Sequence, residues 1–290
     1  MKNIVERLII FIIGLPALLA VVFLFPQKSH LALNICVIIF SVLGAIEFAN
    51  ILKKKNPGLN VAEAAVFGGL SPFAFTLYVS FNWTPFLAAA AVLLCASYCL
   101  IRCAFSPAQK LKDADLRVSA GFSVIFYPGL FLGCIILMST FSDSVQAQTI
   151  LIVTFLCIVM ANDAMAWFFG ILFGRKSKGI IAASPNKSLV GFIAGIASSV
   201  AVGILASLWQ PEVFNAERFS SGVSGIVLGL TTGIASIVGD LAESALKRSS
   251  GVKDSGTLIP GRGGILDSID SIALAAPVFF IVYNVLFNIK

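Results

Sequence analysis

Long, continuous apolar runs separated by short polar segments dominate the chain. Each run holds about 18 to 26 residues, enough at ~1.5 Å per residue to cross ~30 Å of hydrocarbon as a helix. The runs lack the apolar–polar alternation of strands in a membrane barrel. The pattern predicts about nine transmembrane helices, over residues 8–25, 31–52, 63–81, 85–105, 118–140, 148–173, 190–209, 222–239 and 272–289.

The composition agrees with this pattern. Of the 290 residues, 58% are hydrophobic and only 12% are charged, about half the charged share of a soluble domain. Inside lipid the backbone must satisfy its own hydrogen bonds, which long helices do. We therefore predict an all-α polytopic membrane protein. Its six cysteines lie within the apolar runs, where packing is a better explanation than disulfides or a metal site.

The basic residues predict the orientation of the helices. With the N-terminus in the cytoplasm, all of the 20 Lys and Arg residues except Lys28, Arg218 and Lys290 lie in cytoplasmic segments, as the positive-inside rule requires. Nine crossings then place the C-terminus outside. The net charge of +6 is explained by topology, so we expect no nucleic-acid partner. The chain is expected in a bacterial-type inner (cytoplasmic) membrane.

The first run has the basic flank of a secretory signal, supplied by Lys2 and Arg7. Phe23–Gln27, however, is not a small-residue cleavage site, so we expect a retained anchor. Residues 1–149 offer little chemistry beyond Glu47 and Glu63, which we expect at membrane interfaces, and are predicted to form a transmembrane scaffold. Residues 150–290 hold three polar groupings and are predicted to form the catalytic region.

The first grouping is Asn162-Asp163, which interrupts an apolar run. Asp163 precedes Gly174 by eleven residues, about 16 Å along a continuous helix. A carboxylate at that depth costs a few kcal/mol unless it faces a cavity, a partner or an ion. Asp163 is therefore a functional candidate; the alternative is a structural hydrogen bond between helices.

The second grouping is a basic turn. Gly174-Arg175-Lys176 is followed by Ser184-Pro185-Asn186-Lys187-Ser188, directly before a helix expected from about Leu189. Pro and Asn favour a turn, and the N-terminus of a helix attracts phosphate. Ser184, Lys187 and Ser188 are thus candidates for phosphate binding, with an ordinary serine-capped basic loop as the alternative.

The third grouping joins acids, bases and glycines. If the eighth helix continues past the membrane, Asp240, Glu243 and Lys247 share one of its faces, and Asp267 and Asp270 share a face at the start of the ninth. Clustered carboxylates at Asp240, Asp267 and Asp270 repel one another unless a cation such as Mg²⁺ joins them. Favourable interaction of Asp267 and Asp270 with their helix dipole is the structural alternative. The bases available to neutralise phosphate are Lys247, Arg248, Lys253 and Arg262.

These residues resemble the phosphatidate cytidylyltransferase family (CDP-diacylglycerol synthases). Its C-terminal signature is matched at Ser244, Lys247, Arg248, Lys253, Asp254, Pro260, Gly261, Gly263, Gly264, Asp267 and Asp270. Asp163 with Gly170 and Gly174 resembles a second family element, and Ser184–Ser188 resembles a third. The chain departs from the family pattern with Val190 in place of Glu, Arg262 in place of His and Ser268 in place of Arg.

The resemblance implies an integral membrane nucleotidyltransferase of phospholipid biosynthesis, which makes CDP-diacylglycerol and pyrophosphate from CTP and phosphatidate at the cytoplasmic face of the bilayer. Asp240, Asp267 and Asp270 are then expected to hold Mg²⁺ and, with Lys253, to be catalytic. The expected substrate-binding residues are Asp163, Ser184, Lys187, Ser188, Lys247, Arg248 and Arg262. A second, monovalent cation near Asp163 and a homodimer stay open.

Other classes of protein also fit parts of the pattern. Intramembrane acids and glycine-broken helices suit an ion-coupled transporter, although the charges gather at one face and no inverted repeat is evident. A related CTP-dependent lipid kinase or transferase with a different lipid acceptor is the second alternative. A diverged, weakly active paralogue is the third, because of the three departures.

Overall fold

The computed structural model describes residues 13–14, 16–54, 59–215 and 220–288, and these residues form helices joined by turns. The chain divides into two compact units. The first unit comprises Met1–Leu137 and Leu246–Ile269, and the second comprises Met138–Ala245 and Asp270–Lys290. The sequence predicted a division at residue 149, whereas in the structure the segment Leu246–Ile269 groups with the first helices. The scaffold role of residues 1–149 and the catalytic role of residues 150–290 remain predictions.

Eight helices within the described residues are long and apolar enough to cross a membrane. They match the second to ninth predicted runs, which confirms a multi-pass, all-helical protein. Of the first run, 8–25, residues 13–14 and 16–24 are described and are helical, whereas 8–12 and 15 lie outside the described residues. Lys2, Arg7, Arg218 and Lys290, on which the orientation partly depends, also lie outside them. The eight spans are Gln27–Lys53, Val61–Phe81, Phe86–Ala104, Ala114–Phe141, Val145–Leu172, Leu189–Trp209, Ser221–Ser249 and Leu266–Phe287.

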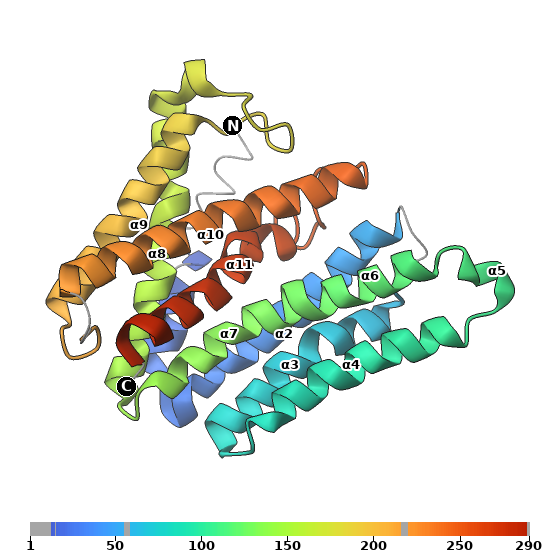
Figure 1. Ribbon diagram of the computed structural model, residues 1–290. Helices are drawn as coiled ribbons and strands as arrows, with labels where there is room; N and C mark the ends of the chain where they lie inside the picture. The colour runs from blue at the N-terminus through green and yellow to red at the C-terminus, as the bar shows by residue number, and fades with distance from the viewer. Residues whose placement is uncertain (1–12, 15, 55–58, 216–219, 289–290) are drawn as a thin grey trace. The chain divides into compact units, whose positions relative to one another are not determined.

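The first unit is built on a tight pair of helices. Its elements are α2 (Gln27–Lys53), α3 (Val61–Phe81), α4 (Phe86–Ala104), α5 (Ala108–Leu111), α6 (Ala114–Val124), the π-helical η1 (Ile125–Phe131) and α7 (Leu132–Leu137). Helices α2 and α3 lie side by side (Figure 1). They approach closely because Gly68 has no side chain: a Cβ there would lie 2.9 Å from the Ser41 carbonyl oxygen. The Ser41 hydroxyl also donates to the Gly68 carbonyl at 2.7 Å.

Glu63 marks the beginning of α3. Asn60 and Glu63 form a capping box, in which the Glu63 amide donates to Asn60 Oδ1 at 2.8 Å and the Asn60 amide donates to Glu63 Oε2 at 3.0 Å. The other Glu63 oxygen accepts from Tyr98 Oη at 3.1 Å and from the Arg102 guanidinium of α4. Glu63 is therefore a structural residue that joins two helices.

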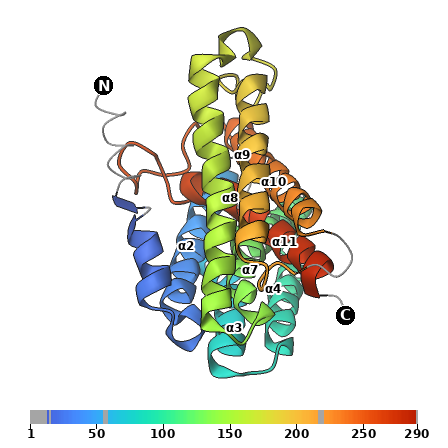
Figure 2. The ribbon, with the colours of Figure 1, turned by 90° about the vertical axis from the view of Figure 1, so that its left-hand side faces the viewer.

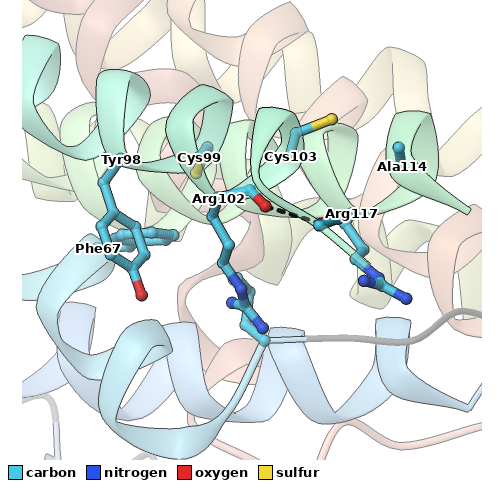
Figure 3. A pocket seen from close by; sticks show the side chains of 9 residues that line it. Phe67, Tyr98, Cys99, Arg102, Cys103, Ala114 and Arg117 are labelled. Carbon is cyan, nitrogen blue, oxygen red and sulfur yellow. Dashed lines mark hydrogen bonds between the residues drawn. The ribbon is translucent and has the colours of Figure 1, made fainter. Parts of the chain in front are cut away.

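A small pocket lies beside this junction. Figure 3 shows the Arg102 and Arg117 side chains extending in the same direction as the Tyr98 hydroxyl, with Phe67 beside Tyr98. The cavity measures about 20 Å³, which is enough for a water molecule and too small for a nucleotide. It is a gap between packed helices.

The second unit contains the 3-10 helix η2 (Met138–Phe141), α8 (Val145–Leu172), the 3-10 helix η3 (Gly174–Ser177), α9 (Leu189–Trp209), α10 (Ser221–Ser249), α11 (Leu266–Tyr283) and the π-helical η4 (Asn284–Asn288). The last residues of α10 and the first of α11 belong to the first unit. Helices α8 and α9 run side by side in both views (Figures 1 and 2). As expected, α10 continues beyond residue 239, to Ser249.

Small residues bring the helices of the second unit together. The buried positions of α9 recur at every fourth residue, and a Cβ at Gly203 would lie 3.1 Å from the Gly229 Cα of α10. Such close backbone approach is a common source of helix association in membranes. The small buried residues of α9 are Gly191, Gly195, Ser199, Gly203 and Ser207.

Asn162 holds α8, α9 and α10 together at one point. Its buried Nδ2 donates to Ser199 Oγ at 2.9 Å and to the Gly233 carbonyl at 3.1 Å. We expect Asn162→Ala to destabilise the protein by about 1–3 kcal/mol, because the buried Gly233 carbonyl loses its side-chain donor. The measurement is the apparent melting temperature of the protein in detergent. Ser198→Ala is the control, since Ser198 bonds only within its own helix; equal melting temperatures for both variants would contradict the prediction.

Candidate active site

In the first unit the polar side chains gather around Asp267. We call Glu47, Lys247, Ser255, Gly264 and Asp267 the loop cluster. Asp267 lies in the first turn of α11, and its Oδ2 accepts from the Ser255 amide, the Ser255 hydroxyl and the Gly264 amide, each at 2.8 Å. Three donors on one oxygen fix the orientation of the carboxylate.

The other Asp267 oxygen, Oδ1, faces the Lys247 ammonium from the last turns of α10. Both side chains are largely buried, at 7% exposed for Asp267 and 11% for Lys247. A charge-assisted hydrogen bond in such surroundings is stronger than one in water. The ion pair therefore joins the end of α10 to the start of α11 and offsets the charge of Asp267.

The glycines between α10 and α11 make room for carboxylates of the protein itself. A Cβ at Gly264 would lie 2.6 Å from the Glu47 carboxyl carbon, and one at Gly256 would lie 2.9 Å from the same atom. Gly263 has a φ of +115°, and a Cβ there would lie 3.3 Å from the carboxyl carbon of Asp267. These glycines therefore have a role within the chain itself: they leave space for its own carboxylates.

Glu47 is the functional candidate that the sequence analysis missed. It was expected at a membrane interface, yet it is 6% exposed and its carboxylate accepts from the Ile265 amide at 3.1 Å, the Leu266 amide at 2.9 Å and the Ser255 hydroxyl at 2.9 Å. An acid within an apolar run was the available signal. Its partners lie about two hundred residues further along the chain, beyond the reach of local patterns.

In the second unit a pocket of about 290 Å³ lies between α8, α9 and α10. Its lining includes four residues predicted to form the site: Asp163, Lys187, Ser188 and Asp240. The Lys187 ammonium pairs with Asp240 Oδ2, and both side chains keep about a quarter of their surface exposed, at 26% and 28%. Apolar walls from Trp167, Phe192 and Ile237 complete the pocket.

Several carboxylates stand near this pocket. Asp270 of α11 is buried and interacts electrostatically with Asp240, Glu243 and Asp163. Helices α10 and α11 meet here, since a Cβ at Gly239 would lie 2.5 Å from the Asp270 carbonyl oxygen. Asp163 accepts from the Ser271 hydroxyl at 3.3 Å. The second unit therefore brings Asp163, Asp240 and Asp270 close together; a shared function for them stays a prediction.

The remaining predicted residues are placed as follows. Ser188 caps α9, as its Oγ accepts from the Gly191 amide at 3.1 Å, so its hydroxyl has a structural role as well as a place in the pocket. The Ser184 carbonyl accepts from the Lys187 amide at 3.1 Å within the turn. Arg248 at the end of α10 and the loop residues Lys253 and Arg262 have exposed side chains that a ligand can reach, and their substrate contacts stay predictions.

The arrangement around Asp240 and around Asp267 suits Mg²⁺ that is bound together with substrate phosphates. Asp240 and Asp267 each hold a cation already, the ammonium of a lysine, and carboxylate oxygens are the ligands that Mg²⁺ prefers. Within the part of the chain that the structure describes, no three His, Cys, Asp or Glu side chains are arranged to hold a metal by themselves. Mg²⁺ is commonly bound through one or two carboxylates together with substrate phosphates, and the residues fit that mode.

Comparisons with known proteins add the following. The model of the cytidylyltransferase family matches residues 5–286. A phosphatidate cytidylyltransferase of Synechocystis is 43% identical over 129 residues, which cover 44% of this chain and 41% of that protein. The uncharacterized protein YnbB of Escherichia coli is 36% identical over 140 residues (48% and 44%). A phosphatidate cytidylyltransferase of Thermotoga maritima is 35% identical over 180 residues (62% and 63%). The aligned parts thus span less than two thirds of each relative.

Proposed function

Because the chain belongs to the cytidylyltransferase family, we propose that it makes CDP-diacylglycerol and pyrophosphate from CTP and phosphatidate. The observation that carries this proposal is the pairing of two of the expected metal ligands with lysines. Asp240 and Asp267 each meet a lysine that the same motifs assign to phosphate, Lys187 and Lys247 respectively. Each ion pair can exchange partners with a magnesium nucleotide: the carboxylate takes the metal and the lysine takes a phosphate oxygen.

The reaction forms one bond and breaks one bond. An oxygen of the phosphatidate phosphate attacks the α-phosphorus of CTP, and the bond from that phosphorus to the bridging oxygen of the β-phosphate breaks, releasing pyrophosphate. The nucleophile is already an anion, so no strong general base is needed. The task of the protein is to bring two polyanions together, which makes positioned positive charge the main contribution to catalysis.

The side chains divide this task. Lys187 in the pocket of the second unit, and Lys247 in the loop cluster, supply charge to phosphate oxygens. The exposed Arg248, Lys253 and Arg262 extend this basic surface and suit anionic headgroups. Asp240, Asp267 and Asp270 are the proposed ligands of Mg²⁺, which when bound adds positive charge that stabilises the leaving pyrophosphate.

The location follows from the same reasoning. We place the protein in the inner membrane with its site on the cytoplasmic side, because CTP is cytosolic and the basic residues mark that side of the helices. The membrane itself is a partner, since it supplies phosphatidate.

A direct assay tests the proposal. Purified protein is given phosphatidate with CTP, dCTP, UTP or ATP, with and without Mg²⁺, and the lipid products are identified by mass spectrometry. We expect CDP-diacylglycerol and pyrophosphate from CTP, with Mg²⁺ required. A phosphorylated lipid with CDP as co-product would instead identify a lipid kinase. Ion flux into proteoliposomes without any nucleotide-dependent product would identify a transporter.

A further inference from the structure

Glu47 is a buried acid of the first unit that the proposed reaction does not use. It comes from the last two turns of the apolar helix α2, and its three hydrogen bonds go to the segment 255–266. A buried carboxylate is costly unless donors surround it. Here the donors are one hydroxyl and two amides at the beginning of α11, where backbone N–H groups have no partner within the helix.

The link from Glu47 to Asp267 passes through Ser255. Ser255 Oγ lies 2.9 Å from Glu47 Oε2 and 2.8 Å from Asp267 Oδ2, and it also accepts from the Asp267 amide at 3.3 Å. Ser255 therefore bridges the two carboxylates. Because its hydroxyl has one proton, it donates to one acid at a time, and the two acids are coupled through it.

The packing leaves Glu47 little freedom to move. Gly256 and Gly264 lie against its carboxylate, where any Cβ would collide with it. The preceding turn of α2 is fixed in the same way: a Cβ at Gly44 would lie 3.0 Å from an Ile269 side-chain carbon of α11. The beginning of α11 is therefore held against α2 by apolar contact and by the Glu47 carboxylate together.

We propose that Glu47 is a positioning residue of the site: through Ser255 and the amides of Ile265 and Leu266, it fixes the carboxylate of Asp267 and the glycine-rich loop before it. Glu47 is given no contact with substrate. Its effect on the rate rests on the proposed function, whereas its effect on the loop does not. Catalytic groups misplaced by about 1 Å can cost on the order of 100-fold in rate.

The experiment compares four variants by amide hydrogen exchange of residues 255–267 and by steady-state kinetics. Glu47→Ala is expected to speed exchange at the Ile265 and Leu266 amides at least about tenfold and to lower kcat about 10- to 100-fold, with KM for CTP changed less than about threefold. Glu47→Gln is expected to fall between, because its one amide oxygen can keep the bonds to Leu266 and Ser255. A smaller effect of Glu47→Gln than of Glu47→Ala on exchange and on kcat would distinguish loss of positioning from a general loss of fold.

Glu63→Ala is the matched control. It removes another acid of the first unit, whose carboxylate accepts from the Asn60 amide and from Tyr98 and Arg102 of α4, and should change neither loop exchange nor kcat by more than about twofold. Should Glu47→Ala fail to fold, Ser255→Ala decides: it deletes the bridging hydroxyl, keeps the bonds from the Ile265 and Leu266 amides to Glu47, and is expected to lower kcat about three- to tenfold.

Two results would overturn the proposal. One is unchanged loop exchange in Glu47→Ala, and the other is faster exchange with wild-type kcat, which would make Glu47 a helix cap only. If the wild-type protein forms no product from CTP and phosphatidate, the proposed function fails, while the exchange data still decide whether Glu47 fixes the loop.

Discussion

Asp267→Asn is expected to lower cytidylyl transfer by about 10²- to 10³-fold, as removal of a positioned electrostatic group does in other enzymes. Asparagine keeps the shape of the side chain. Its amide oxygen can take the place of Oδ2 and accept from the Ser255 and Gly264 amides, so the loop is expected to keep its fold. The charge, however, is lost, and the amide nitrogen would then face the Lys247 ammonium in place of Oδ1.

The measurement is kcat at saturating CTP and phosphatidate, together with hydrogen exchange of the loop. Asp267→Ala serves as the second variant and should lose both activity and the order of the loop, because all the accepting oxygens are gone. Asp115→Asn, on the exposed surface of α6, is the control and should match the wild type. Activity of Asp267→Asn within tenfold of the wild type would exclude a catalytic role for this carboxylate.

The pattern of the sequence predicts the membrane spans well, because the thickness of the bilayer sets their length. Hydropathy does not mark where the helices end. The ninth span was expected from residue 272, but α11 begins at Leu266. Hydropathy does not mark this start, because the polar first turn is stabilised by hydrogen bonds from backbone amides to the Glu47 carboxylate. Likewise α10 runs to Ser249, because charged residues spaced three and four apart on one face support a helix beyond the apolar run.

The candidate site was predictable where its residues are close in sequence. The Ser188 cap and the turn before α9 follow from local chemistry, as does the shared face of Asp240 and Lys247. Glu47 was not predictable, because an acid in an apolar run is equally consistent with an interface and with a buried donor set. The same limit applies to Gly256 and Gly264, whose close neighbour is the Glu47 carboxylate of α2.

The two lysine–aspartate pairs also explain how so many acids are tolerated near a membrane. The negative charge of Asp240 is neutralised by Lys187, and that of Asp267 by Lys247. A lysine ammonium is carried by a flexible four-carbon side chain, so it can change partners. In the absence of ligand the pair is satisfied internally; with a nucleotide bound, the same lysine can serve a phosphate. A neutral hydrogen-bond donor fixed in place of lysine could also stabilise the carboxylate, but it would offer no positive charge to a substrate phosphate.

Lys187→Ala is therefore expected to raise KM for CTP by about 10- to 100-fold, the equivalent of one charge-assisted hydrogen bond of roughly 1.5–3 kcal/mol. Without the ammonium, Asp240 lines the pocket with its charge uncompensated, and Asp163 lines the same pocket, so the nucleotide phosphates meet repulsion in place of attraction. Lys187→Arg keeps the charge and should retain most of the affinity.

The measurement is CTP affinity by titration calorimetry, alongside KM, because binding does not require a competent reaction. Lys176→Ala is the control: Lys176 lies in η3 with an exposed side chain, so it tests the general attraction of a basic segment for an anion. That attraction is screened by salt, whereas a direct contact in a partly enclosed pocket is screened less. The loss of CTP affinity in Lys187→Ala should therefore persist at high ionic strength. A loss that disappears at high salt, or that Lys176→Ala reproduces, would contradict the prediction: Lys187 would then only add to the positive potential around the pocket, without contacting the nucleotide.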